Sequence, residues 1–151
     1  MAAGIAELRL IADYQFGTGS GQALFPDSVE IHRTSSGRPQ QIFLSNNRLV
    51  SYGIDGRFTL GMEGGYRLQA HLSHPKYRVI VDDESEPFVR TGRNVFAKFV
   101  TSVDHVIRPG DEILVEHTSG RLIAVGRAEL SAEAMDDFDT GMAVKVRDSI
   151  E

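Results

Sequence analysis

Side chains that can bind phosphate gather at two places in the second half of this 151-residue chain. One group follows a predicted short helix and runs into the next predicted strand, and the other lies on the last predicted strand. Arg and Lys side chains, with backbone N–H groups at glycines and helix ends, are the groups that hold phosphate oxygens in proteins. The candidates are Arg90, Gly92, Arg93, Asn94, Phe96, Lys98, Lys145 and Arg147. Singly, each cation is most simply a solvated surface charge, so only the clustering favours a site.

The period of a β-strand places some of these residues on common faces. Asn94, Phe96 and Lys98 are two residues apart and therefore share one face of their predicted strand. Lys145 and Arg147 share a face of the last strand in the same way. The Phe96 ring could stack on an unpaired base, but burial in the core is the commoner fate of a phenylalanine and is the preferred interpretation.

The remaining polar groups form no recognisable catalytic or metal-binding motif. The segment Gly17-Thr18-Gly19-Ser20-Gly21 lacks the Lys-Ser/Thr ending of a P-loop and is predicted to be a flexible turn, whose amides could still hold a phosphate. His71 and His74 have a poor spacing for a metal on a strand and no carboxylate beside them in sequence, so neither a metal nor another cofactor is expected. The acidic residues within 82–84 and 136–139 are predicted to be solvated ends of elements.

The composition limits the class of protein. The chain has no Cys, which excludes disulfides, thiolate zinc sites and cysteine nucleophiles. The net charge is −5, so the protein does not have the overall positive field of a non-specific nucleic-acid binder. Any phosphate site must therefore be a local cluster of cations. No apolar run is long enough to span a bilayer and the N-terminus lacks the order of a signal peptide, so a cytoplasmic location without membrane association is expected.

Turn signals divide the first half into short elements. The pattern predicts a helix over residues 2–14, strands that include 41–44 and 57–60, and turns at 35–37, 45–47, 55–56 and 63–65. A proline preceded by small polar residues interrupts the pattern at residues 71–75 and indicates a boundary near residue 75.

The second half is predicted to be mostly β. The pattern predicts strands at 77–81, 94–103 and 142–148, a hairpin of 112–118 with 121–130, and short helices at 85–91 and 132–138. Ser85 and Ser131 are the predicted N-caps, while Gly92 and Gly141 are the glycines expected to end the helices. Met135 and Phe138, three residues apart, are predicted to face inward together.

The order of motifs in the second half resembles the PUA domain of pseudouridine synthases and archaeosine transglycosylases. The resemblance rests on GRNVFAKFV at 92–100, IRPGDEI at 107–113, LIAVGRAELS at 122–131 and GMAVKVR at 141–147. The first half resembles the segment that precedes the PUA domain in archaeal transglycosylases, through residues 13–26 and 55–60.

This resemblance implies both a fold and a function. The implied fold is α+β and mostly β, with a small pre-PUA unit at residues 1–75 and a PUA pseudo-barrel of mixed strands with two short helices at 76–151. In the family, the helix-to-strand loop and the last strand line an RNA groove, so the eight candidates inherit that role. The implied partners are tRNA or another structured RNA, together with a separately encoded RNA-modification enzyme.

The chain also departs from the archaeal transglycosylase. That enzyme needs a carboxylate nucleophile in a barrel and a cysteine-rich zinc site, whereas 151 residues cannot contain the barrel and there is no Cys. No catalytic residue is therefore expected. The acidic net charge leaves one alternative open, a protein–protein adaptor that uses the PUA fold without binding RNA.

Overall fold

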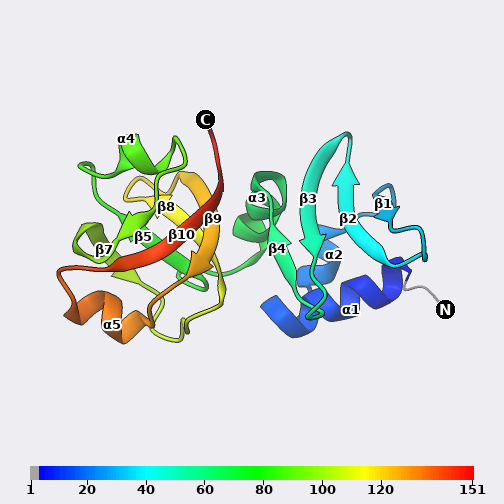
Figure 1. Ribbon diagram of the computed structural model, residues 1–151, viewed down its shortest axis with the longest axis horizontal. Helices are drawn as coiled ribbons and strands as arrows, with labels where there is room; N and C mark the ends of the chain where they lie inside the picture. Colours follow the sequence, from blue (N-terminus) through cyan, green and yellow to red (C-terminus); the bar gives the residue numbers. More distant parts are fainter. Residues whose placement is uncertain (1–3) are drawn as a thin grey trace. The chain divides into compact units, whose positions relative to one another are not determined.

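The computed structural model describes residues 4–151 (Figure 1). Contacts between Cα atoms divide the chain into two compact units, of which the first ends at Leu72 and the second begins at Ser73. The division falls within the break in the pattern at residues 71–75. Ala2 and Ala3, with which the predicted first helix begins, lie outside the described residues.

The described part of the first unit combines helices with a four-stranded antiparallel sheet. The helices are α1 (Ile5–Phe16), α2 (Ser20–Leu24) and α3 (Met62–His71). The strands are β1 (Glu30–Arg33), β2 (Pro39–Leu44), β3 (Asn47–Tyr52) and β4 (Phe58–Leu60), paired in chain order. The turns predicted at 35–37, 45–47 and 55–56 are confirmed as the connections, and Ser45 and Asn46 adopt positive φ there.

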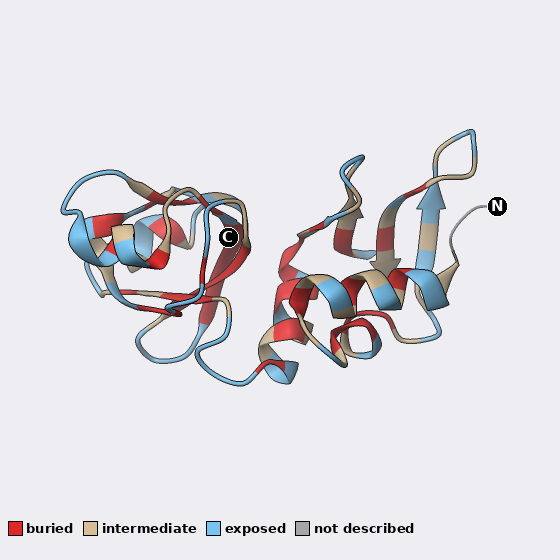
Figure 2. Ribbon diagram, turned by 90° about the horizontal axis from the view of Figure 1, so that it is seen from below, coloured by how far each residue is buried: buried red, intermediate tan, exposed pale blue. Residues whose placement is uncertain are grey.

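One face of this sheet forms the core of the first unit with the helices. Figure 2 shows buried and exposed residues alternating along α1. The buried stripe of α1 consists of Leu8, Ala12 and Phe16. From the sheet, Ile42 and Val50 face each other in register and are fully buried, and Phe58 meets Phe25 edge-on with ring centroids 5.4 Å apart. The other face of the sheet is left to polar and partly exposed side chains.

The turn predicted at residues 63–65 is wrong, because these residues lie in α3. A Cβ atom at Gly64 would collide with the carbonyl oxygen of Leu49 in β3. Just before the helix, the Gly61 N–H donates to the same carbonyl at 2.9 Å. The absence of side chains therefore lets the helix approach the strand closely, which outweighs the low helix propensity of glycine.

The turn predicted at residues 17–21 is confirmed at residues 18–19, between α1 and α2, but not at residues 20–21. Ser20 begins α2, and the Ser20 N–H donates to the Gly17 carbonyl at 3.1 Å. The Gly21 N–H donates to Oδ1 of Asp13 at 2.7 Å. Both amides are thereby occupied and cannot hold a phosphate without losing these bonds.

A six-stranded mixed sheet dominates the second unit. Its strands are β5 (Arg78–Val81), β6 (Val95–Phe96), β7 (Val100–Val103), β8 (Glu112–His117), β9 (Leu122–Ala128) and β10 (Met142–Ser149). The order is β6-β10-β9-β8-β5-β7, with β5 and β8 parallel and the other pairs antiparallel. The helical elements are α4 (Glu86–Val89), the 3-10 turn η1 (Ala97–Phe99) and α5 (Ala132–Asp137). The predicted mostly-β unit of mixed strands with short helices is confirmed.

The two edge strands of this sheet, β6 and β7, are joined only by η1. Three residues can span at most about 10 Å, so the sheet must curl until its edges approach each other. The single strand predicted over residues 94–103 is therefore wrong in its middle, where the chain crosses from one edge to the other. The Ala97 N–H donates to the Gly141 carbonyl at 2.9 Å at this crossing, which ties it to the start of β10.

The central strands of the second unit hold a continuous apolar core and one buried ion pair. The residues from Ile113 to Val115 in β8 and from Ile123 to Val125 in β9 are all buried, as expected for strands covered on both faces. Within this layer Nε of Arg78 lies 2.9 Å from Oε2 of Glu116, and both side chains are 5% exposed.

The helix caps match the prediction only in part. The Ser131 hydroxyl accepts the Ala134 N–H at 3.1 Å, as predicted for an N-cap. Ser85 occupies the N-cap position of α4, but its side chain makes no capping bond; Oδ1 of Asp82 accepts the Ser85 N–H at 2.9 Å instead. Phe138 is 53% exposed rather than inward, because α5 ends one residue before it.

None of the helices within residues 4–151 combines the length and apolar character needed to cross a membrane.

Candidate nucleic-acid interface

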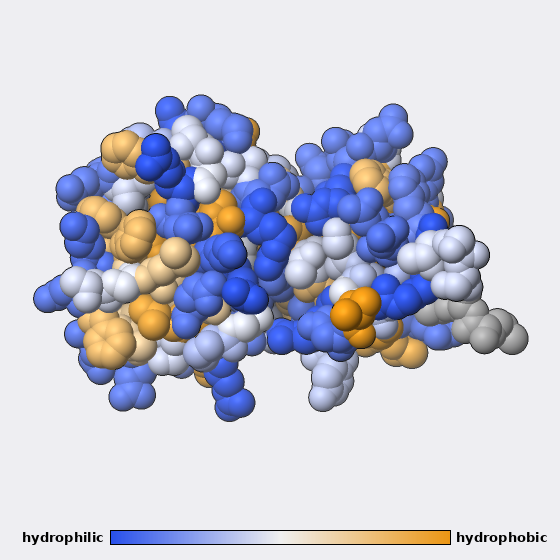
Figure 3. Space-filling view, in the orientation of Figure 1, coloured by the Kyte–Doolittle hydropathy of each residue, from blue (hydrophilic) through white to orange (hydrophobic). Residues whose placement is uncertain are grey.

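Aromatic side chains line a hollow beside α4 in the second unit. Phe88 is 59% exposed and Phe96 is 45% exposed, although large aromatic side chains usually bury most of their surface. With the partly exposed Phe99 they bound a cavity of about 260 Å³. Figure 3 shows apolar side chains gathered on the visible face of this unit. The hollow is large enough for a planar ring and offers phenyl faces to stack on.

One polar group of this hollow has no hydrogen-bond partner among residues 4–151. This group is the hydroxyl of Ser85, a residue that is 5% exposed and lines the hollow. A buried hydroxyl without a partner costs about 1–3 kcal/mol, and one that lines a hollow can regain a hydrogen bond from a group that enters it. Asn94 lines the same hollow, with Oδ1 held by the Val146 N–H at 2.9 Å.

A second hollow of about 450 Å³ shares Phe96 and Phe99 with the first. Lys98 lies on its rim, with Nζ 4.9 Å from the centroid of the Phe99 ring. The two hollows therefore form one aromatic surface, which we call the aromatic groove. Arg93 lines the first hollow and Lys98 lines the second.

The structure corrects two predictions about this segment. Phe96 is not a core residue, because β6 ends with it and its ring faces the groove. Lys98 does not share a strand face with Asn94, since it lies in η1. Lys98 nevertheless lines the groove, because the η1 turn directs it there. Lys98 and Phe96 are therefore close together, but not because they share a strand face.

The two predicted cations that follow α4 differ in whether acidic side chains pair with them. Arg90 is neutralised, with Nη1 at 3.5 Å from Glu86 and Nε at 2.8 Å from Glu151. Arg93 is exposed and makes no ion pair within the described chain. Gly92 adopts φ +105° and turns the chain between them. A Cβ atom there would meet only the Ser149 hydroxyl, at an ordinary contact distance of 3.6 Å, so the positive φ and not a lack of space favours glycine.

The predicted cations of β10 line a separate hollow of about 210 Å³ with Arg127 and Val146. Lys145 is exposed and lies opposite Arg127 in the β9–β10 register. Arg147 is held by Oε1 of the buried Glu112 at 2.6 Å, and Arg127 by Oε1 of Glu129 at 3.0 Å. Residues 4–151 provide no ion-pair partner for Lys145, so it is the cation of this hollow that can take up a phosphate without breaking a pair.

Four contributors were missed by sequence reasoning. They are Ser85, Phe88, Phe99 and Arg127. Arg127 could have been found by pairing the last two predicted strands, because the β9–β10 register places it opposite Lys145. The three others depend on how α4 and η1 turn, which no spacing in the sequence encodes.

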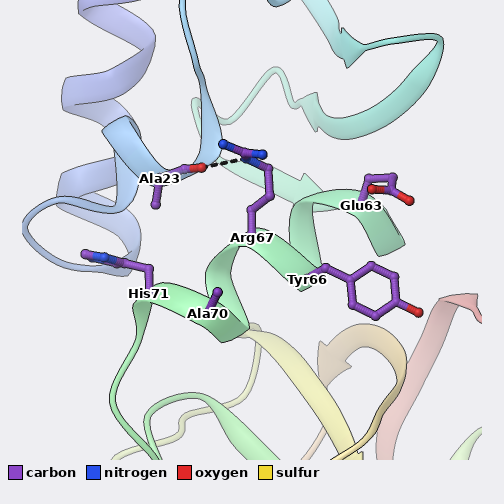
Figure 4. Close-up of a pocket in the computed structure, with 6 residues that line it drawn as sticks. All are labelled: Ala23, Glu63, Tyr66, Arg67, Ala70 and His71. Carbon is purple, nitrogen blue, oxygen red and sulfur yellow. Dashed lines mark hydrogen bonds between the residues drawn. The ribbon is translucent and has the colours of Figure 1, made fainter.

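A hollow of about 500 Å³ in the first unit lies along α3 (Figure 4). Its Arg67 donates from Nε to the Ala23 carbonyl at 2.7 Å, and Nε2 of His71 lies 3.1 Å from the Thr18 carbonyl. Both side chains thus hold the chain around α2 in place. Among residues 4–151, no three His, Cys, Asp or Glu side chains are grouped so that they could hold a metal ion.

Comparison with known proteins agrees with this architecture. Residues 77–150 match the PUA domain, and residues 6–75 match the patch-forming domain C2 of tRNA-guanine transglycosylase. Residues 77–150 thus belong to the PUA family, and a C2 domain followed by a PUA domain is the order expected for the C-terminal region of an archaeal tRNA-guanine transglycosylase.

Similar proteins support the same conclusion. The tRNA-guanine(15) transglycosylase of Thermococcus kodakarensis is 45% identical over 142 residues, which are 93% of this chain and 24% of that enzyme. The chain therefore spans about a quarter of the length of the curated relatives it matches.

Solved structures show the same fold. A hypothetical protein from Pyrococcus horikoshii OT3 superposes with a TM-score of 0.74 at 23% identity, covering 96% of this chain and 89% of that one. A conserved PUA domain protein from Thermoplasma acidophilum superposes with a TM-score of 0.68 at 24% identity, covering 97% and 91%.

Proposed function

We propose that this chain is a non-catalytic RNA-binding module that holds tRNA or another structured RNA through its PUA unit. The single observation that carries the proposal is the aromatic groove, in which exposed phenyl rings, a buried hydroxyl without a partner and unpaired cations meet. The match to the PUA domain and the likeness to a tRNA-modifying enzyme support it.

In the proposed complex an unpaired base enters the groove and the backbone follows the cations. Phe88 and Phe96 stack on the base, because every base presents a π-face, and Ser85 bonds its edge. Arg93, Lys98 and Lys145 contact phosphates, whereas Arg90 and Arg147 mainly position the surface through their ion pairs. We assign residues 1–75 to the pre-PUA domain and 76–151 to the PUA domain.

The module has no catalytic role in this proposal and acts in the cytoplasm beside an RNA-modification enzyme. It matches only about a quarter of the transglycosylase of Thermococcus kodakarensis, so the chemistry would come from a separately encoded enzyme. Neither a metal nor another cofactor is required for binding of this kind.

Filter binding of the protein to total tRNA across a salt series tests the proposal. Arg93, Lys98 and Lys145 make no ion pair within residues 4–151, so phosphate contacts by all three should release counterions. The logarithm of the association constant should then fall with the logarithm of salt concentration with a slope of roughly −2. Absence of salt-dependent binding at micromolar protein contradicts the proposal.

The alternative function is a protein–protein adaptor. The exposed Phe88, Phe96 and Phe138 favour it, because an apolar surface of this kind suits a protein partner. A pull-down from a nuclease-treated extract distinguishes the two functions. Retention of a partner after RNA is destroyed, together with no effect of Arg93→Ala on it, favours the adaptor.

A further inference from the structure

The open face of the first unit's sheet carries a row of hydrogen-bonding side chains. The register pairs His32 with Gln41, Gln41 with Ser51, and Ser51 with Thr59, so one such residue comes from each strand. Gln41, Ser51 and Thr59 are partly exposed, in contrast to Ile42 and Val50 on the covered face. A polar open face is ordinary for an antiparallel sheet, so this row alone does not define a site.

His32 of this row and the neighbouring Phe43 form a stacking platform. His32 and Phe43 lie with ring centroids 4.3 Å apart and an interplanar angle of 24°. The His32 side chain is 51% exposed and Phe43 is partly exposed. Glu30, the acidic neighbour, lies 3.5 Å from Nε2 of His32. A stacked pair open on one side can be extended by another flat ring.

An arginine is positioned next to the platform. Arg48 lies opposite Phe43 in the β2–β3 register, and its Nη1 donates to the Ser51 hydroxyl at 3.2 Å. Its guanidinium lies against Gly61, because a Cβ atom at Gly61 would be 3.2 Å from Cζ of Arg48. Since no ion pair of Arg48 occurs in the described part of the chain, the group is held in place with its charge uncompensated.

From this juxtaposition we propose that the open sheet face of the first unit is a second binding site for unpaired RNA nucleotides. A base stacks on the His32–Phe43 pair, the polar row bonds base edges, and Arg48 contacts a phosphate. The inference rests on the proposed function, because it extends RNA binding from the PUA unit to the first unit.

Photo-crosslinking of the full chain distinguishes this site from the aromatic groove of the second unit. The probe is a 12-nucleotide oligouridylate that contains 4-thiouridine, and the crosslinked peptides are identified by mass spectrometry. Adducts within both residues 30–52 and residues 85–99 are expected. Adducts confined to residues 85–99 overturn the second site and leave the proposed function intact, whereas no adduct at all overturns both.

A pair of variants checks the assignment. The Phe43→Ala/Arg48→Ala variant should lower the adduct yield within residues 30–52 at least about 10-fold, the loss expected from one stacking contact. The control Tyr14→Ala/Arg57→Ala removes an aromatic and a cation elsewhere on the exposed surface of the same unit and should leave the yield unchanged. Equal losses in both variants, or a loss only in the control, overturn the proposal; thermal unfolding of each variant verifies that it is folded.

Discussion

Oδ1 of Asn94 accepts a hydrogen bond from the backbone N–H of Val146 at 2.9 Å. Asn94 lines the aromatic groove and Val146 lines the hollow that contains Lys145, so this bond joins the two parts of the candidate interface. The loop that follows α4 is thereby fixed against the last strand. A bound RNA would meet two surfaces already held in register.

Replacing Phe96 tests the stacking role of the groove. Phe96→Ala should weaken tRNA binding about 10-fold, because base stacking on one aromatic side chain contributes about 1–3 kcal/mol. The thermal midpoint should change little, since the ring is 45% exposed. Phe138→Ala is the matched control: its ring is 53% exposed in the same unit but lines neither hollow of the groove. Equal effects of the two changes on affinity would contradict a specific role for Phe96.

Ser85 is expected to separate stability from binding. Ser85→Ala removes a buried hydroxyl that has no partner, so the free energy of unfolding should not fall. RNA affinity should drop about 5-fold, because a bond to the bound base is lost. Urea unfolding and filter binding measure the two quantities. A loss of stability would show that the hydroxyl has a partner in the free protein.

The salt dependence of binding distinguishes unpaired from paired cations. Lys145→Ala should reduce the magnitude of the salt slope by about 0.7, the share of one phosphate contact with single-stranded RNA. Arg90→Ala should change it less, because that guanidinium already lies between Glu86 and Glu151. Binding isotherms at several salt concentrations decide the matter, and a larger effect of Arg90→Ala would refute the distinction.

The buried ion pair of the second unit should be needed for folding. Glu116→Ala leaves Arg78 charged and buried, which should cost about 3–5 kcal/mol in the free energy of unfolding. Glu129→Ala breaks a more exposed pair with Arg127 and should cost less than about 1 kcal/mol. Chemical denaturation of both variants measures the loss in the free energy of unfolding. Similar losses would show that the buried pair contributes no more to stability than the exposed one.

Strand alternation and turn signals were sufficient to predict most of the elements. The hairpin of β8 and β9, the Ser131 cap and the turns of the first sheet depend on neighbours in sequence, and they are confirmed. The errors occur where distant packing decides the local structure. Gly64 was predicted in a turn because glycine disfavours helices, but contact with the Leu49 backbone makes it necessary in α3.

The candidate site was predicted as a set of residues but not as a surface. Phe96 was assigned to the core because burial is the usual fate of phenylalanine, and its exposure follows from the turn at Ala97–Phe99 that closes the sheet. Likewise, the neutralisation of Arg90 by Glu151 joins residues from distant parts of the chain. Such pairings depend on the closed fold, which the local pattern does not contain.

The most direct test of the central claim is to map the RNA on the protein in solution. Amide chemical shifts of the full chain, recorded during titration with tRNA, should move most at Ser85, Arg93, Phe96 and Val146, which surround the groove and the adjoining hollow. Shifts concentrated at these residues, and weakened by added salt, are the predicted result. Unchanged amide shifts at these residues at saturating tRNA would contradict RNA binding by the aromatic groove.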